Sequence, residues 1–328
     1  MIDKEFLNNM LFKTEETAWK TIEEKLYDVF SPPFLDSPIQ EIIKRESKVS
    51  DLELLISGTS WDLWNNFDTN VQKTSKALIG FWETNYNGKA IFIIDGLSLR
   101  EIPFILDQAK ERGFCIHESK ITASTLPTDT TNFAKSLGFS QRSALENNGA
   151  GNSHFLTGAI TEVTDLPWQD CIPLISHNPN LVLWHTSFDD RIHEYKVPGK
   201  GLRELSLKSK EYFTSDGFWL LVEKLAMGRR VVITSDHGYA STGDFTNING
   251  NQGEYLKETY KSQRYVKNSE KKLTKSTPPI EIQIENEQGI FSYVLGRRKW
   301  KNSGGYPTLS HGGLSLMEAM VPFIELSK

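Results

Sequence analysis

The spacing of apolar residues divides the chain into two parts near residue 85. Before that point, apolar side chains recur every three or four positions, as an amphipathic helix requires. Such patterns cover residues 15–30, 39–44, 51–56 and 71–82. Beyond it, short continuous apolar runs alternate with helical patterns, which is typical of a doubly wound α/β domain. We therefore predict a helical region over residues 1–85, packed on an α/β domain over residues 86–328.

Three of the apolar runs predict buried strands that end in polar residues. They cover residues 90–94, 181–184 and 231–234. Asp95 directly follows the first run, and the pair Asp236-His237 closely follows the third. In a parallel sheet the carboxyl ends of the strands meet at one edge, where such side chains come together. An aspartate beside a histidine can ligate a divalent metal. The alternative is ordinary turn chemistry, because Asp-His-Gly also suits a tight turn.

Two further places add histidines of the same kind. Asp189 and His193 are four residues apart, so on a helix they share a face and could hold a metal together, although a surface ion pair would have the same spacing. His185 and Asp190 lie close to this pair in the sequence and could be mistaken for its metal ligands. His311 lies in a His-Gly-Gly turn, where the glycines permit close backbone approach.

Residues 127–132 form a dense group of helix-capping residues, Pro-Thr-Asp-Thr-Thr-Asn, ahead of an apolar helical pattern. They predict either a helix cap without chemistry or a hydroxyl at a helix N-terminus, where an anionic oxygen is favoured. We take Thr130 as the candidate hydroxyl, and Thr131 stays open as its alternative.

Two polar segments predict loops near the candidate site. Residues 146–153 predict a loop over the site, and residues 242–277 predict an inserted lid or loop region. Within it, Arg264 is a candidate phosphate contact or part of a solvated face. The basic cluster 296–301 predicts either a nucleic-acid contact or a solubilising hairpin tip.

The composition is that of an ordinary globular protein, with 38% hydrophobic and 24% charged residues among 328. A net charge of −5 gives no reason by itself to expect nucleic-acid binding. Two cysteines without C-x-x-C spacing predict free thiols in a reducing cytoplasm. No apolar run approaches the roughly 18 residues of a membrane span, and the N-terminus is too polar for a signal peptide. We therefore expect a cytoplasmic protein without a membrane segment.

Taken in chain order, these residues resemble a known family. The motifs are Ile-Ile-Asp-Gly-Leu at 93–97, Leu-Pro-Thr-Asp-Thr at 126–130, Ile-Thr-Ser-Asp-His-Gly at 233–238 and His-Gly-Gly-Leu-Ser at 311–315. Each is weak alone, but their order over residues 85–328 is similar to that of the PglZ domain branch of the alkaline phosphatase superfamily. The resemblance implies an alkaline-phosphatase-like sheet flanked by helices.

The resemblance also implies a centre with two zinc ions, or manganese in their place. One ion would be held by Asp95, Thr130, Asp236 and His237, and the other by Asp189, His193 and His311. Thr130 would attack phosphorus as the nucleophile, and the second ion would stabilise the leaving oxygen or activate water. Asn132 and Arg264 are candidate substrate contacts.

For the reaction, the resemblance and the residues together predict a phosphodiesterase acting on a nucleotide or nucleic-acid diester. Threonine without a C-x-P-x-R motif favours phosphate over sulfate esters. No Arg or Lys lies near the predicted ligands in sequence to meet a second phosphate charge, since Arg191 falls on another helical face. The alternatives are a phosphomonoesterase of the same superfamily and an inactive PglZ-like partner-binding subunit. PglZ domains also suggest phage-defence or signalling proteins as partners.

Overall fold

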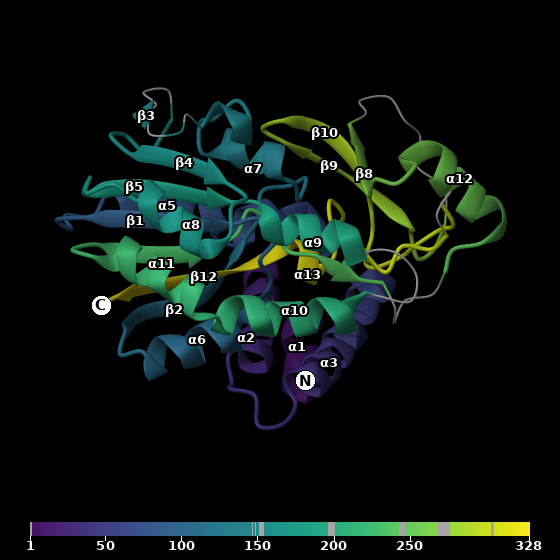
Figure 1. Cartoon of the computed structure of the whole chain (residues 1–328). Coiled ribbons are helices and arrows are strands. Elements are labelled where there is room, and N and C mark those ends of the chain that lie inside the picture. The colour runs from purple at the N-terminus through teal and green to yellow at the C-terminus, as the bar shows by residue number, and fades with distance from the viewer. Residues whose placement is uncertain are drawn as a thin grey trace.

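The computed structural model describes residues 2–145, 147, 149–150, 154–195, 201–242, 247–267, 276–302 and 305–328. Its centre is a seven-stranded sheet in the order β2-β12-β6-β1-β5-β4-β3 (Figure 1). The strands are β1 (Lys89–Ile94), β2 (Cys115–Ala123), β3 (Gly149–Ala150), β4 (Ile160–Thr164), β5 (Asn180–His185), β6 (Arg230–Thr234) and β12 (Met320–Ser327). Strands β6, β1, β5 and β4 are parallel, whereas β12 is antiparallel to both of its neighbours. The predicted α/β fold class is confirmed.

The strand register brings the polar ends of three strands level with one another. Ile94 of β1 lies opposite His185 of β5, and Ile93 lies opposite Thr234 of β6. Asp95 and the segment that begins at Ser235 therefore leave the sheet at the same edge. This places the predicted metal ligands of β1 and β6 within reach of each other.

Helices cover both faces of the sheet. Along β1, Ala90, Phe92 and Ile94 belong to one hydrophobic cluster, whereas Ile91 and Ile93 belong to another. Alternate side chains of a strand point to opposite faces, so a strand buried on both faces reads as a continuous apolar run. The larger cluster contains residues of α6 (Ile102–Glu111), α8 (Trp168–Cys171), α9 (Ser187–Tyr195), α10 (Leu202–Thr214), α11 (Asp216–Ala226) and α13 (Leu316–Ala319). The smaller cluster contains residues of α5 (Thr74–Trp82) and α7 (Thr130–Ser136).

The region before residue 85 is helical and shares the core of the α/β domain. It contains α1 (Lys4–Phe12), α2 (Glu15–Phe30), α3 (Pro38–Thr59), α4 (Phe67–Asn70) and the 3₁₀ helix η1 (Trp61–Asn66). The patterns at 39–44 and 51–56 are two parts of the single helix α3. Trp19 packs edge to face on Trp64 and Phe67, which are themselves tilted against each other. All three are buried, with centroid distances of 4.9–5.1 Å. These aromatic residues belong to the hydrophobic core.

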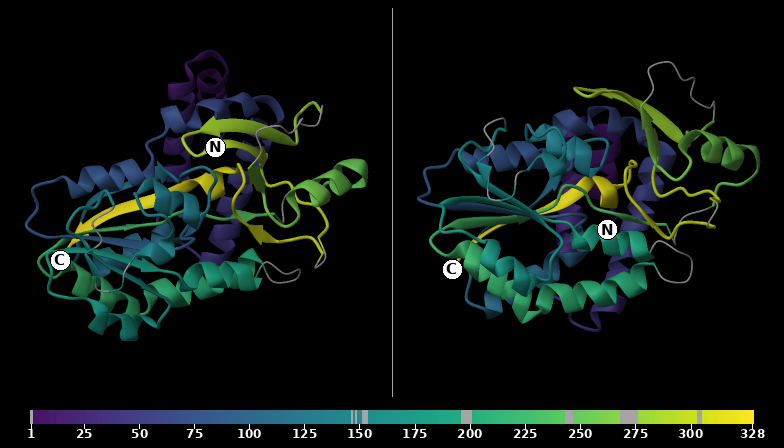
Figure 2. Two further views of the ribbon diagram at one scale, coloured as in Figure 1. Left: turned by 90° about the horizontal axis from the view of Figure 1, so that it is seen from above. Right: turned by 45° about the horizontal axis from the view of Figure 1, so that its top comes forward.

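The segment expected to be an inserted loop is more ordered than the sequence suggested. Its described part forms α12 (Gly250–Tyr260) and β8 (Tyr265–Lys267), and β8 pairs with the hairpin β9 (Glu281–Asn286) and β10 (Gly289–Val294). Residues 243–246 and 268–275 lie outside the described residues. This small β unit has a core of its own (Leu256, Tyr260, Ile280, Val294 and Trp300). It stands beside the end of the sheet (Figures 1 and 2).

Both interpretations of the basic cluster 296–301 are wrong for Arg297 and Trp300. Arg297 is fully buried and pairs with Glu46 and Glu53 of α3, and Trp300 lies in the core of the small β unit. The pattern misled because buried arginines paired to distant carboxylates cannot be told from exposed ones in sequence.

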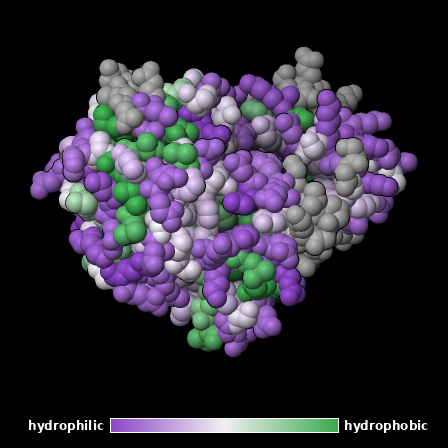
Figure 3. Space-filling view, viewed as in Figure 1, coloured by the Kyte–Doolittle hydropathy of each residue, from purple (hydrophilic) through white to green (hydrophobic). Residues whose placement is uncertain are grey.

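The predicted loop over 146–153 falls mainly on residues 146, 148 and 151–153, which lie outside the described ones, while Gly149–Ala150 form β3. No helix in the described part of the chain is long and apolar enough to cross a membrane. The face shown in Figure 3 is largely hydrophilic, with hydrophobic residues in separate patches.

Candidate metal centre

The strand tips of β1 and β6 are joined directly behind the candidate site. The backbone N–H of Gly96 donates to Asp236 Oδ1 at 3.2 Å. Gly96 has a φ of 78°, and a Cβ at this position would lie 2.7 Å from Cδ1 of Ile192. Only glycine fits such a turn without strain, which explains the Asp-Gly pair at the end of β1.

Asp95, Asp236 and His237 form the first candidate ligand group. All three are fully buried, and their ligand atoms lie within 4.8 Å of one another. His237 Nε2 is 3.5 Å from Asp95 Oδ1 and 3.7 Å from Asp236 Oδ2. Thr130 Oγ1 lies 3.4 Å from the same Oδ1 of Asp95. The structure thus brings together four predicted residues from three separate elements.

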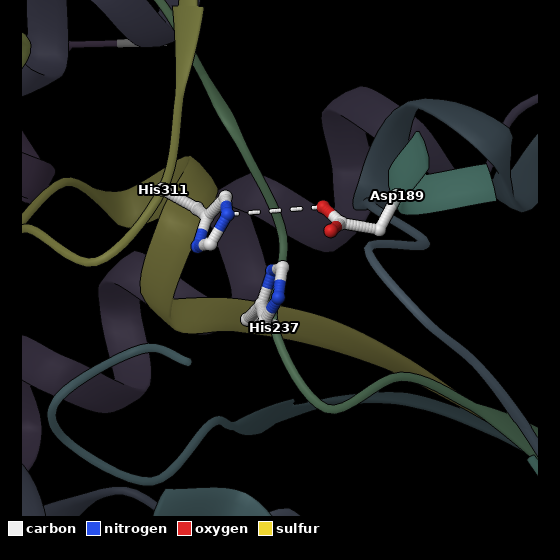
Figure 4. A group of neighbouring side chains, drawn as sticks. All are labelled: Asp189, His237 and His311. Carbon is white, nitrogen blue, oxygen red and sulfur yellow. Dashed lines mark ion pairs between the residues drawn. The ribbon is translucent and has the colours of Figure 1, made fainter. Parts of the chain in front are cut away.

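Asp189, His237 and His311 form the second group (Figure 4). Asp189 Oδ1 is 3.8 Å from His311 Nε2, and the rings of His237 and His311 stack at a centroid distance of 4.2 Å. His193 joins this group at its rim: its Nε2 lies 3.0 Å from Asp189 Oδ2 and 3.4 Å from His311 Nε2. The two groups therefore meet at His237. All seven predicted ligands are neighbours, and their role as ligands stays a prediction.

The buried carboxylates dominate the electrostatics of the site. Burial and the carboxylates of Asp236 and Asp189 raise the pKa of Asp95 well above its ordinary value. Burial alone would lower the pKa of His237, but the three surrounding aspartates outweigh it and raise the pKa to about 9. Burial and the neighbouring His237 lower the pKa of His311 to about 4. The three aspartates repel one another in this buried cluster, and a bound cation would relieve that repulsion.

Three buried polar atoms in the cluster indicate that a metal ion would fit there. Asp189 Oδ1, Asp236 Oδ2 and His237 Nε2 have no hydrogen-bond partner among the described residues. A buried polar atom without a partner is unfavourable unless an ion or another group satisfies it. Carboxylate oxygens and imidazole nitrogens are the donors that zinc accepts, and manganese accepts them too. The residues present therefore fit divalent metal ions.

The helix cap beside the site is made by Asp129. Its side chain accepts from the backbone N–H and the side-chain Nδ2 of Asn132, at 2.8 and 2.7 Å. Thr130 is the first residue of α7, and both Thr130 and Thr131 line a cavity in front of the site. Asn132 is buried, and its amide N–H is used by Asp129. This geometry favours a role for Asn132 in holding the Asp129 cap of α7, rather than the predicted contact with substrate.

Arg264 also lies differently from what the sequence suggested. It is buried behind the His311 turn, where Nε donates to Glu318 at 2.8 Å, Nη1 donates to the Arg298 carbonyl at 2.7 Å and Nη2 donates to the Gly296 carbonyl. Since carboxylate and carbonyl oxygens take up its donors, Arg264 holds the turn in place. The predicted phosphate contact does not agree with this geometry.

His185, the histidine that lies near the predicted ligand pair in sequence, has a structural role. Its Nε2 lies 2.8 Å from the Leu166 carbonyl, and its ring packs on Trp168 at 4.1 Å. Asp190 is exposed and belongs to neither ligand group.

Sequence reasoning missed Arg142. This residue opens the 3₁₀ helix η3 (Arg142–Ala144), and its Nη1 pairs with Oδ2 of Asp95. The two residues are 47 positions apart, and no motif marks residues 141–143. Only the fold brings this cation into the site.

A cavity of about 830 Å³ opens in front of the candidate metal ligands. Its lining includes the predicted ligands Asp189, His193 and His311. It also includes the residues Thr130, Thr131, Arg142, Tyr265 and Tyr306. A cavity of this size admits a small-molecule ligand.

Parallel strands of the central sheet lead into Asp95 and the pair Asp236-His237, and the other candidate ligands lie on α9 and in the His311 turn. With the Thr130 hydroxyl beside them, they define an α/β protein with a candidate two-metal centre. The model of the family described as "BREX system PglZ alkaline phosphatase-like domain" matches residues 153–326, so the chain belongs to this PglZ family of the alkaline phosphatase superfamily. The match contains the five candidate ligands from Asp189 onward, whereas Asp95 and Thr130 precede it.

Solved structures with a similar fold are distant. Murine ectonucleotide pyrophosphatase/phosphodiesterase 5 is 10% identical, with a TM-score of 0.43, over 73% of this chain and 88% of that one. The human protein is 14% identical, with a TM-score of 0.45, over 73% and 87%. Phosphonoacetate hydrolase from Sinorhizobium meliloti 1021, in complex with phosphonoformate, is 14% identical, with a TM-score of 0.40, over 73% and 89%. No curated protein sequence matches the chain. The family assignment therefore rests on the family model.

Proposed function

We propose that this protein is a metal-dependent phosphoryl-transfer hydrolase with Thr130 as its nucleophile. The observation that carries the proposal is the buried cluster of aspartates and histidines, with three unsatisfied ligand atoms, next to the Thr130 hydroxyl. Membership of an alkaline phosphatase-like family supports the same reaction class.

In this proposal Asp95, Thr130, Asp236 and His237 hold one ion, and Asp189, His193 and His311 hold the other. Zinc is the expected metal and manganese the alternative. Such ions supply Lewis acidity and lower the pKa of a bound hydroxyl or water. The protein positions the reacting groups: β1 and β6 fix the two buried aspartates, and Asp95 accepts a hydrogen bond from the Thr130 hydroxyl. That bond orients Oγ1 toward the cluster.

The substrate is either a phosphodiester or a phosphomonoester. The sequence predicts a phosphodiesterase with a nucleotide or nucleic-acid substrate, and the 830 Å³ cavity has room for such an ester. One reason for that prediction was the lack of a nearby cation, and Arg142 removes this reason. A phosphomonoesterase is thus the second candidate.

We expect the reaction to serve a phage-defence or signalling system. The family description names the BREX system, which agrees with the phage-defence setting expected from the resemblance. Other proteins of a defence or signalling system are the expected partners, in the cytoplasm. An inactive partner-binding subunit is disfavoured because all seven predicted residues come together in the fold.

Metal content and ester hydrolysis test the proposal together. We expect about two zinc ions per chain by elemental analysis, thermal stabilisation by zinc or manganese, and turnover of p-nitrophenyl phosphate esters. Kinetics on the mono-ester and the bis-ester side by side decide the ester class. The absence of both bound metal and a thermal shift would refute the metal centre. A metal-loaded protein without turnover would support the inactive subunit.

A further inference from the structure

Arg142 occupies a position in this site that no motif assigns. It follows α7, lines the cavity together with Thr130 and Thr131, and pairs through Nη1 with Oδ2 of Asp95. Asp95 Oδ1 is on the other side of the carboxylate, within 3.4 Å of Thr130 Oγ1 and 3.5 Å of His237 Nε2. The guanidinium is therefore one carboxylate away from the proposed nucleophile.

The guanidinium keeps donors for a ligand. Its side chain is 35% exposed toward the cavity, and among the described residues only Asp95 accepts a hydrogen bond from it. The other arginine that lines the cavity, Arg264, has its donors taken by Glu318 and two carbonyls. Arg191 is near the ligands in sequence but points elsewhere, and it pairs with Glu194 at 3.7 Å. Arg142 is thus the arginine of the described cavity wall that can still bind an anion.

We propose that Arg142 binds the non-bridging oxygens of the phosphoryl group that Thr130 attacks, and that it adapts the site to a terminal phosphoryl group with two negative charges. The planar guanidinium can hold Asp95 with one N–H while others meet phosphoryl oxygens in a fork. A fixed cation next to the reacting centre stabilises charge on those oxygens. This inference rests on the proposed function, because it requires phosphoryl transfer at the same site.

The inference predicts a preference for the ester class. A mono-ester presents three non-bridging oxygens that share two charges, whereas a diester presents two that share one. Arg142 should therefore contribute more to a mono-ester than to a diester. A purely positioning role, in which Arg142 only orients Asp95 for its metal, would affect metal binding and both esters alike.

Four zinc-reconstituted proteins separate these roles: the wild type, Arg142→Gln, Arg142→Lys and the matched control Arg191→Gln. Binding of inorganic phosphate is measured by calorimetry, zinc content by elemental analysis, and kcat/KM on p-nitrophenyl phosphate and on bis-(p-nitrophenyl) phosphate. Thermal unfolding checks that each variant is folded, which the partial exposure of Arg142 favours.

We expect Arg142→Gln to weaken phosphate binding by about 10- to 100-fold, the usual effect of losing charge-assisted hydrogen bonds. The mono-ester should lose more kcat/KM than the diester, zinc content should stay at the wild-type level, and Arg142→Lys should recover part of the loss. Arg191→Gln should match the wild type.

Unchanged phosphate affinity in Arg142→Gln would overturn the inference, as would a loss of zinc or an equal loss on both esters. If the wild type hydrolyses esters and only the variant result is negative, the inference alone fails. If the metal-loaded wild type neither turns over esters nor binds phosphate, the proposed function fails and the inference fails with it.

Discussion

Thr130 lies where helix α7 meets the candidate metal ligands. Asp129 caps α7, so the Thr130 hydroxyl is not needed as the cap and can point toward Asp95. The adjacent Thr131 lines the same cavity, but no hydrogen bond from its side chain to Asp95 or His237 is found in the described part of the chain. This difference favours Thr130 as the nucleophile.

Replacing Thr130 with alanine should reduce turnover at least a thousandfold, because the reaction loses the group that forms the covalent intermediate. Metal content should fall little, since six other ligands remain. Steady-state kinetics and elemental analysis check both points. Thr131→Ala is the matched control and should stay active; the reverse result would move the nucleophile by one residue.

Asp236→Asn should lower the zinc content from about two ions to one or fewer per chain. The substitution keeps the shape of the side chain but removes the charge, and Oδ2 of Asp236 is one of the buried atoms without a partner. Elemental analysis after dialysis measures the content. The exposed Asp190→Asn serves as the control, and full zinc content in Asp236→Asn would contradict the assignment.

We predict that Glu23 of α2, which lies away from the site, makes the stability of the folded protein depend on pH. Burial and the neighbouring Glu24 raise its pKa from 4.5 to about 7. Between these values the folded state holds a proton that the unfolded state releases, so this residue lowers the stability as the pH rises from about 4.5 to about 7. Glu23→Gln should therefore raise the unfolding temperature above pH 7 and change it little near pH 4. An equal shift at both pH values in thermal unfolding would contradict this cause.

A buried network of charged residues connects helix α3 to the loops behind the candidate metal centre. Glu46 accepts from Arg100 at 2.7 and 2.8 Å and pairs with Arg297, and Glu53 pairs with Arg297 as well. Arg100 also donates to the Tyr239 carbonyl, three residues beyond Asp236 in the chain. The network thus connects an N-terminal helix to the segment that carries Asp236 and His237.

Glu46→Gln should destabilise the fold by about 3 kcal/mol, because it leaves the buried Arg100 without its carboxylate partner and Arg297 with Glu53 alone. Chemical denaturation measures the free energy of unfolding. Glu254→Gln removes an exposed carboxylate that pairs with Lys257 at 3.5 Å and should change stability little. Equal stability of both variants would show that the buried network is replaceable.

At the level of the whole chain, the N-terminal helices belong to the main core. Trp19, Ile22, Leu26 and Leu52 are fully buried in the same cluster as Phe92 and Ile94 of β1. The proposed division at residue 85 is therefore one of sequence pattern rather than of independent folding.

A fragment of residues 86–328 should fail to fold alone, because it would expose the side of the core that α2 and α3 cover. Circular dichroism and thermal unfolding of the fragment, beside the full chain, check this. A soluble fragment with a cooperative transition would show that residues 1–85 are dispensable for folding.

The sequence alone determined the features that depend on near neighbours in the chain. Apolar runs of strand length predicted β1, β5 and β6, because a strand covered on both faces must be apolar throughout. Since parallel strands expose their carboxyl ends at one edge, Asp95, Asp236 and His237 could be expected to meet there. The order of motifs identified the PglZ family, which the family model confirms.

Tertiary structure decided the features that depend on pairs far apart in the chain. Arg142 and Asp95 are 47 residues apart, Arg264 and Glu318 are 54 apart, and Arg297 and Glu46 are 251 apart. An arginine looks the same in sequence whether it faces water, a buried carboxylate or a cavity, because its environment is set by segments that fold against it. For this reason the sequence placed Arg264 in the site, left Arg142 out and took Arg297 for a surface residue.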